Sequence, residues 1–255
     1  SFLRTKVYIL RCGASKSARA YNYMSTPIIC FGQQPCGFFP KRYLIAKINT
    51  ARKLQKEIGG KIVFFYHDSD ADYRDTITIL EDPKTKEEVR LNFSQGSKIQ
   101  KKYSPLYIKN IAEGWKVEII RKLPRFVSKN VIELFESIKS TTVADFCLEI
   151  YTKMGLLEGI EVVRSSDKNF RENASDLKAF YADVPYEGEI VRAEMYEGIL
   201  RLHEGGGNYI NIPTPPSIEK YQKNAARDYR FNWMQSVIHS THYVLGAGES
   251  AYLKK

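Results

Sequence analysis

An acidic cluster is the segment of this sequence best suited to chemistry. Asp68, Asp70 and Asp72 alternate with Ser69 and Ala71, directly after an apolar run. Carboxylates at this spacing can bind Mg²⁺ through oxygen ligands, hold a substrate amine, or act as a general base. The alternative is a solvated loop in which one carboxylate caps a helix. We take Asp70 and Asp72 as the candidates for catalysis.

A second polar segment is bounded by Gly32 and Gly37 and contains the adjacent glutamines Gln33 and Gln34. A buried glutamine amide needs hydrogen-bond partners for both its donor and its acceptor, so a ligand contact is expected here. A helix that follows such a loop could also offer its first backbone N–H groups to an anion. The loop matches neither the Walker pattern nor G-x-G-x-x-G. A tight turn without a ligand is the alternative.

The chain around these segments is patterned as a strand, a helix and a second strand. Residues 27–31 and 61–66 are short apolar runs typical of buried strands, and residues 42–58 carry apolar side chains at helical spacing. Two strands joined in this way are expected to be parallel, with a right-handed crossover. Ligands bind beyond the carboxyl ends of the strands in such sheets, where both polar segments fall.

The rest of the chain extends this pattern to a single α/β domain over residues 1–255. We expect four strands to be parallel neighbours, those near residues 28–31, 61–66, 160–164 and 242–245. Period-two alternation predicts a further strand over 6–11, a β-hairpin insertion over 76–93 and a β-meander insertion over 188–212. Helices are predicted over 14–24, 105–123, 128–138, 142–154 and 217–229, while the apolar stretch 231–238 receives no assignment.

The end of the sequence holds two further candidate sites. Gly246 and Gly248 form half of a dinucleotide-binding fingerprint just before Glu249, and a simple tight turn is the alternative. His239 and His242 could share a face as metal ligands only if that segment is helical. No Cys or Asp pattern joins them, so we predict no metal site.

Composition limits the class of partner. The net charge of +10 over 255 residues favours an anionic small molecule or a nucleotide, with nucleic acid as the alternative. Four cysteines without CxxC spacing are expected to be reduced thiols, which favours the cytoplasm. No run approaches the roughly 18 apolar residues of a membrane span, so no membrane partner is expected. The oligomeric state is left open.

Five motifs, taken in order, resemble the bacillithiol-biosynthesis cysteine-adding enzymes, a family of cysteine ligases. Four of them are the loop of residues 32–38 with a helix bearing Lys47, the acidic segment 70–73, the helix and strand of 143–167, and Gln235. The fifth is the turn of residues 246–252, which resembles the family's Gly-Pro-Gly-Glu-x-Ala-Tyr element. The chain departs from the family in its Phe39-Pro40-Lys41 segment and in Ala71, which stands where the family has histidine. It is also about half as long and lacks the family's C-terminal coiled coil.

The resemblance implies a Rossmann-like core related to class I aminoacyl-tRNA synthetases and nucleotidyltransferases. It further implies an enzyme that joins an amino acid, such as cysteine, to an amine-bearing acceptor, with ATP or another nucleotide as the open choice of cofactor. Catalysis would then fall to Asp70, Asp72 and Glu249, and substrate binding to Gly32, Gln33, Gln34, Gly37, Lys47, Gly246, Gly248 and Tyr252. The alternative function is a non-catalytic Rossmann-like module that binds a nucleotide, RNA or a partner protein.

Overall fold

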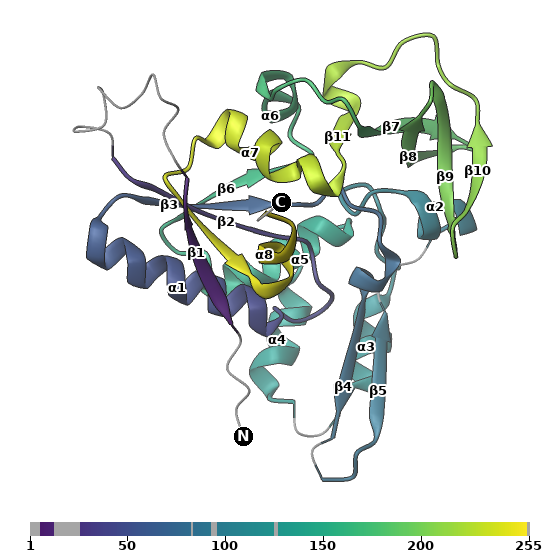
Figure 1. Ribbon diagram of the computed structural model, residues 1–255. Coiled ribbons are helices and arrows are strands. Elements are labelled where there is room, and N and C mark those ends of the chain that lie inside the picture. Colours follow the sequence, from purple (N-terminus) through teal and green to yellow (C-terminus); the bar gives the residue numbers. More distant parts are fainter. Residues whose placement is uncertain (1–5, 13–25, 83, 93–95, 125–126, 254–255) are drawn as a thin grey trace.

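A five-stranded, mostly parallel sheet forms the centre of the molecule. The computed structural model describes residues 6–12, 26–82, 84–92, 96–124 and 127–253, so the helix predicted over 14–24 lies outside this part of the chain. In spatial order the strands are β1 (Val7–Arg11), β12 (His242–Gly246), β2 (Ile28–Gln33), β3 (Lys61–Tyr66) and β6 (Ile160–Arg164) (Figure 1). The last four are parallel neighbours, as the apolar runs predict, and β1 joins β12 antiparallel at the edge.

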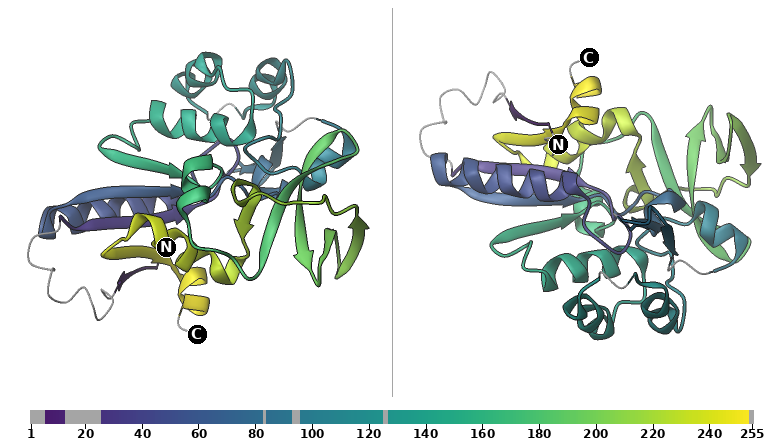
Figure 2. Two further views of the ribbon diagram at one scale, coloured as in Figure 1. Left: turned by 90° about the horizontal axis from the view of Figure 1, so that it is seen from above. Right: turned by 90° about the horizontal axis from the view of Figure 1, so that it is seen from below.

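Successive side chains of the central strands point to opposite faces of the sheet and pack into two separate hydrophobic cores. Ile29 and Phe31 face one core, which contains apolar side chains of α1 (Arg42–Ile58) and α5 (Val143–Lys153). Cys30 and its neighbours in β3 face the other core, together with α7 (Arg230–Ile238) and α6 (Lys168–Asn173). Figure 2 shows the teal helices on one side of this sheet and the yellow C-terminal helices on the other. The sheet is therefore covered on both faces, as parallel sheets generally are.

A second five-stranded sheet, entirely antiparallel, lies beside the central one. Its spatial order is β10 (Asn208–Ile212), β9 (Ile199–Gly205), β8 (Glu189–Tyr196), β7 (Phe180–Tyr186) and β11 (Lys223–Ala225). The meander expected over 188–212 thus supplies only three of its strands. The helix α2 (Lys98–Tyr103) packs against it, and the sheet has a hydrophobic core of its own. The smaller hairpin pairs β4 (Ile77–Glu81) with β5 (Glu88–Asn92).

Two predicted helices are wrong, and tertiary hydrogen bonds explain both errors. Ser104 ends α2 instead of starting a helix, because the N–H groups of Leu106 and Tyr107 donate to the carbonyls of Asp70 and Asp68 at 2.8 and 3.1 Å. Helix returns only at α3 (Trp115–Lys122), followed by α4 (Lys129–Ser137). Residues 217–229 form two short 3₁₀ turns around β11, which pairs with β7, and the unassigned stretch 231–238 belongs to α7.

A buried ion pair joins the second sheet to the central one. The Arg171 guanidinium of α6 donates to the Asp183 carboxylate of β7 at 2.8 Å and to the Ser165 carbonyl, just after β6, at 2.8 Å. The Tyr107 hydroxyl also donates to Asp183 at 2.8 Å. These contacts fix the second sheet near the carboxyl end of β6. Among the described residues, no helix has both the length and the apolar character needed to cross a membrane.

Candidate functional site

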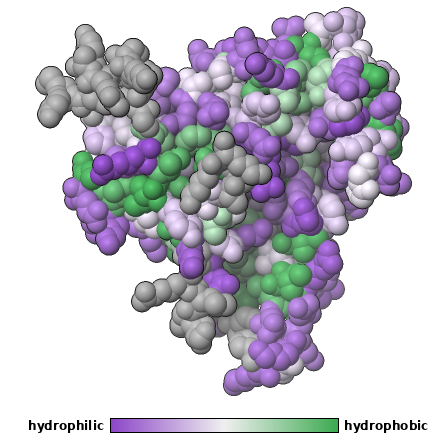
Figure 3. Space-filling view, viewed as in Figure 1, coloured by the Kyte–Doolittle hydropathy of each residue, from purple (hydrophilic) through white to green (hydrophobic). Residues whose placement is uncertain are grey.

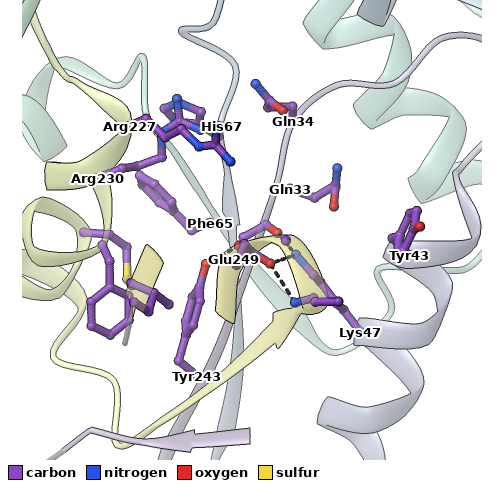
Figure 4. A pocket seen from close by; sticks show the side chains of 17 residues that line it. Gln33, Gln34, Tyr43, Lys47, Phe65, His67, Arg227, Arg230, Tyr243 and Glu249 are labelled. Atoms are coloured by element: carbon purple, nitrogen blue, oxygen red, sulfur yellow. Dashed lines mark hydrogen bonds and ion pairs between the residues drawn. The ribbon is translucent and has the colours of Figure 1, made fainter. Parts of the chain in front are cut away.

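A cavity of about 360 Å³ opens at the carboxyl ends of β12, β2 and β3 (Figure 4). The sequence predicts a ligand site at this edge, and the structure brings most of the candidates there. The predicted residues that line it are Gly32, Gln33, Gln34, Lys47, Gly246, Gly248 and Glu249. The remaining walls come from α1, from β3, and from the turn and helix of residues 227–234. Segments from both ends of the sequence therefore meet in one site.

An ion pair between Lys47 and Glu249 forms one wall of the cavity. The Lys47 side chain is 4% exposed, and its ammonium group donates to the Gly32 carbonyl at 2.7 Å as well as to the Glu249 carboxylate. That carboxylate also accepts the Gly246 N–H at 2.8 Å and the Tyr243 hydroxyl at 3.1 Å. Glu249 is thus fully engaged as the counterion of a buried lysine. These contacts give it a positioning role, and the catalytic role expected from sequence stays a prediction.

Position 32 requires a glycine because the backbone of β2 passes close to the Tyr243 side chain. A Cβ atom at this position would lie 2.7 Å from the Tyr243 hydroxyl oxygen, inside van der Waals contact. That hydroxyl is held by Glu249 at 3.1 Å, so it cannot move without breaking a hydrogen bond. The absence of a side chain at Gly32 therefore lets the β2 backbone approach the polar groups of the cavity.

His67 is the buried polar group that the sequence reasoning missed. It follows β3 directly, is 2% exposed, and lines the cavity, yet neither of its ring nitrogens has a hydrogen-bond partner among the described residues. Burial, reinforced by the positive charges of Arg230 and Arg192, lowers the pKa of His67 well below its usual range. The ring is therefore neutral at physiological pH, with one donor and one acceptor available. A ligand in the cavity would satisfy them.

Asp70 lies behind the cavity and holds two of the groups that line it. Its carboxylate accepts hydrogen bonds from the Gln34 amide, from Arg230 at 3.4 Å and from the Ala71 N–H at 2.7 Å. Burial opposes its ionisation, but Arg192 and Arg230 hold the pKa of Asp70 well below its usual range. So acidic a carboxyl group is a poor general base. Asp70 therefore positions Gln34 and Arg230, and the catalytic role expected from sequence stays a prediction.

Asp72 and Gly37 do not line this cavity. The Asp72 carboxylate accepts the Arg74 N–H at 2.9 Å, forms an ion pair with the Arg74 guanidinium, and caps the 3₁₀ turn Tyr73–Thr76, which is the capping alternative. Gly37 donates its N–H to the Asp75 carbonyl at 2.7 Å, and a Cβ there would lie 2.3 Å from the Thr78 hydroxyl oxygen. Gly37 thus packs the loop against the hairpin.

The remaining candidates are placed as follows. His239 ends α7 with a φ of 50°, and His242 lies in β12, so the two share no helical face. Within the described residues, no group of three or more His, Cys, Asp or Glu side chains could hold a metal ion. Tyr252 falls in α8 (Ala247–Leu253), outside the side chains that the structure describes.

Asp75, beside Asp72, gives the stability a pH dependence that can be measured. Burial raises the pKa of Asp75 to about 6, with the Lys41 ammonium at 3.5 Å opposing the shift. The folded state therefore binds more protons than the unfolded state between about pH 4 and 6, so its stability falls as the pH rises through this window. Asn cannot lose a proton, so Asp75→Asn does not lose this stability. We expect its free energy of unfolding, relative to that of the wild type, to rise by about 2–3 kcal/mol from pH 4 to pH 7, at about 1.4 kcal/mol per pKa unit.

Urea unfolding of both proteins at pH 4 and pH 7 measures this difference. The exposed Asp82, whose carboxylate accepts the N–H groups of Lys84 and Thr85, is the control position, since its pKa is lowered by these bonds instead of raised. The free energy of unfolding of Asp82→Asn, relative to that of the wild type, should therefore not rise from pH 4 to pH 7. Parallel stability curves for wild type and Asp75→Asn would contradict the prediction.

Positive charge dominates the remaining wall of the cavity. Arg227 and Arg230 line it beside His67, opposite Lys47 (Figure 4). The Gln33 side chain also lines the cavity and makes no hydrogen bond within the described part of the chain. Sequence reasoning did not find Arg227 and Arg230, because a continuous helix over 217–229 gave no reason to place them at the sheet edge. The arrangement is suited to a carboxylate or phosphate with a further polar group near His67.

Comparison with known proteins does not assign this chain to a family. The sequence matches no model of a known protein family and no curated protein.

Proposed function

We propose that the protein is an enzyme with a Rossmann-like core that joins an amino acid, such as cysteine, to an amine-bearing acceptor. Two of the motifs that resemble the cysteine-adding enzymes, the Gly32–Gln34 loop and the Gly246–Glu249 turn, line one cavity although they lie far apart in the sequence. The cavity lies beyond the carboxyl ends of parallel strands, where Rossmann-like proteins bind ligands. The observation that carries the proposal is the buried, unpartnered His67 in that cavity.

The cavity offers complementary groups to the two reactants. Arg227 and Arg230 supply positive charge for a carboxylate or phosphate, and the neutral His67 ring can accept a hydrogen bond from an amine. Joining a carboxyl group to an amine releases water, so the carboxyl group must first be activated. ATP or another nucleotide is the candidate for that activation. Asp70 and Glu249 would hold the surrounding groups in position.

The second candidate function is a Rossmann-like module that binds a nucleotide, RNA or a partner protein without chemistry. The observation in its favour is that the two carboxylates nearest the cavity are already engaged, Glu249 with Lys47 and Asp70 with Arg230. Product formation separates the two functions. Cysteine, glucosamine 6-phosphate as an amine-bearing probe, and ATP should yield an amide detectable by mass spectrometry if the first function is correct. Ligand binding without any condensed product favours the second.

His67→Phe should abolish the response to ligand without destabilising the protein. Because the ring nitrogens have no partners, an apolar ring of similar size leaves no hydrogen bond unmade and removes the cost of burying them. For the wild type, a ligand at 100 times its Kd adds about 2.7 kcal/mol, which corresponds to roughly 5–10 °C in Tm for a chain of this size. Thermal melting with cysteine, ATP and glucosamine 6-phosphate, singly and together, measures the difference.

His242→Phe is the matched control, because His242 lies on β12 and does not line the cavity. It should keep the full ligand-induced shift. A wild-type protein whose Tm responds to none of these compounds would remove the support for the enzyme. An equal response of His67→Phe and wild type would remove His67 from the site.

A further inference from the structure

A second cavity, of about 520 Å³, lies between the acidic loop after β3 and the second sheet. Asp70, Asp72 and Arg74 line it from the loop, and Tyr181, Arg192 and Tyr209 from the sheet. Its volume falls in the range of small-molecule sites, about 300–1,000 Å³. Of the residues that line it, none lines the first cavity. The two cavities are therefore separate spaces, and Asp70 contacts both sets of side chains.

The second sheet presents aromatic and cationic side chains on one face. Side chains of alternate residues, such as Val191 and Leu202, fill the sheet's own core, so their neighbours along each strand point to the opposite face. Cross-strand pairing places Tyr181 opposite Glu194, Glu194 opposite Arg201, and Tyr209 opposite His203. Figure 3 shows hydrophilic side chains mixed with hydrophobic ones over this sheet, at the upper right. The face with Tyr181, Arg201 and Tyr209 thus carries both aromatic and charged side chains.

Guanidinium groups stack on tyrosine rings across this face. The Arg192 guanidinium carbon lies 3.7 Å from the centre of the Tyr181 ring. The Arg201 guanidinium lies between two rings, 3.7 Å from Tyr196 and 3.9 Å from Tyr209. Tyr209 is 41% exposed. Flat stacks of this kind, with accessible rings and guanidinium planes, are the surfaces on which unpaired nucleobases stack.

Arg192 is the cation on this face whose charge is least satisfied by hydrogen bonds. Arg201 donates to Glu194 at 2.9 Å, and Lys102 to Glu204 at 2.7 Å. By contrast, Arg192 forms no ion pair within the described residues, and its Nε atom is buried without a hydrogen-bond partner. A phosphate in the cavity would give the Arg192 guanidinium a counterion, and guanidinium groups are well suited to phosphate.

The carboxylates that line the cavity are neutralised by other groups. Asp72 pairs with Arg74, and Glu204 with Lys102. Asp70 pairs with Arg230 on its other side, and its ionised form is also stabilised by the positive charge of Arg192. With a net charge of +10 for the whole chain, the surroundings attract a polyanion and do not repel it.

We propose that this cavity and the adjoining sheet face bind a nucleotide unit. The base would stack on the exposed Tyr209 ring or on the Arg192–Tyr181 pair, and the phosphate would bind Arg192. A free mononucleotide and a nucleotide within a single strand present this same chemistry. The basic charge of the chain favours the strand, because each additional phosphate adds attraction.

Fluorescence anisotropy with a labelled 12-nucleotide single-stranded RNA tests the proposal on the intact protein. Tyr209→Ala and Arg192→Gln should each weaken binding about 10-fold, the size expected for loss of one stacked base. Tyr8→Ala and Arg121→Gln, at exposed positions on β1 and α3, are the matched controls and should bind as the wild type does. Raising the salt from 50 to 200 mM should weaken binding steeply. Because Tyr209 is 41% exposed and outside the hydrophobic core of the sheet, its variant remains informative if Arg192→Gln fails to fold.

Competition by AMP and UMP distinguishes the two sources of the ligand. Displacement of the RNA by micromolar mononucleotide identifies a free nucleotide, and displacement only by unlabelled strand identifies nucleic acid. No binding of either, or equal loss in the control variants, overturns the proposal. His67→Phe separates this test from that of the first cavity, because it should leave RNA binding unchanged.

Discussion

Arg171→Leu lowers the free energy of unfolding by about 3–5 kcal/mol, the cost of leaving one partner of a buried ion pair without its counterion. The side chains of Arg171 and Asp183 are 2% and 4% exposed. The substitution removes the guanidinium that donates to Asp183 at 2.8 Å, to the Ser165 carbonyl at 2.8 Å and to the Tyr221 carbonyl at 2.7 Å. Equilibrium unfolding in urea, followed by far-UV circular dichroism, measures the loss.

Two further variants show whether the ion pair itself is responsible. Arg171→Leu combined with Asp183→Leu should recover part of the loss, because no buried charge is then left unpaired. Lys168→Gln removes a 66% exposed charge from the same helix and should change the stability by less than about 0.5 kcal/mol. A loss below about 1 kcal/mol for Arg171→Leu would show that the second sheet is held to the centre by other contacts.

Lys47→Met has the second-largest expected effect, because it acts on the stability and the binding site together. We expect a loss of about 2–4 kcal/mol, toward the lower end for a buried pair because the Glu249 side chain keeps 22% of its surface exposed. The Gly32 carbonyl also loses its 2.7 Å hydrogen bond, so the shape of the cavity changes. The ligand-induced rise in Tm should therefore disappear as well.

Lys53→Met is the matched control for this substitution. Lys53 lies in the same helix, is 81% exposed, and pairs only with Glu57 at 4.0 Å. It should change neither the stability nor the response to ligand. Lys47→Met combined with Glu249→Gln should regain part of the stability, since the remaining carboxamide carries no charge. A Lys47→Met protein with wild-type binding would show that the ion pair does not shape the cavity.

The central sheet could be predicted because its local signals agree with its tertiary structure. The apolar run 61–66 is fully buried from Ile62 to Tyr66, and the helix before it ends at Ile58, as its sequence predicts, with Gly59 as the cap. The second sheet gave weaker signals. Pro185 lies within β7, where a proline disfavours a strand prediction, and β11 is three residues long and pairs with β7. The pairing of β11 depends on residues about 40 positions earlier in the sequence, so the local sequence pattern does not predict it.

The candidate site shows the same division. Gly32, Gln33 and Glu249 could be placed at one sheet edge from the topology together with the order of the motifs, and these three residues line one cavity. The roles of the carboxylates could not be predicted, because they depend on which cationic side chain forms an ion pair with each one. Asp72 meets Arg74 two residues away, and Asp70 meets Arg230. Likewise, a single histidine after a strand cannot be recognised from sequence as a functional-site candidate, because its burial is known only from the structure.

The position of β12 in the sheet has a consequence for biosynthesis. β2, β3 and β6 can pair as soon as residue 164 has left the ribosome, whereas among the described strands β1 pairs with β12, more than 230 residues later. Contacts of such long range slow folding and leave strand edges exposed in the meantime. The facing edges of β1 and β2 thus stay open until residues 242–246 have been synthesised, and Lys47 acquires its counterion Glu249 only after that point.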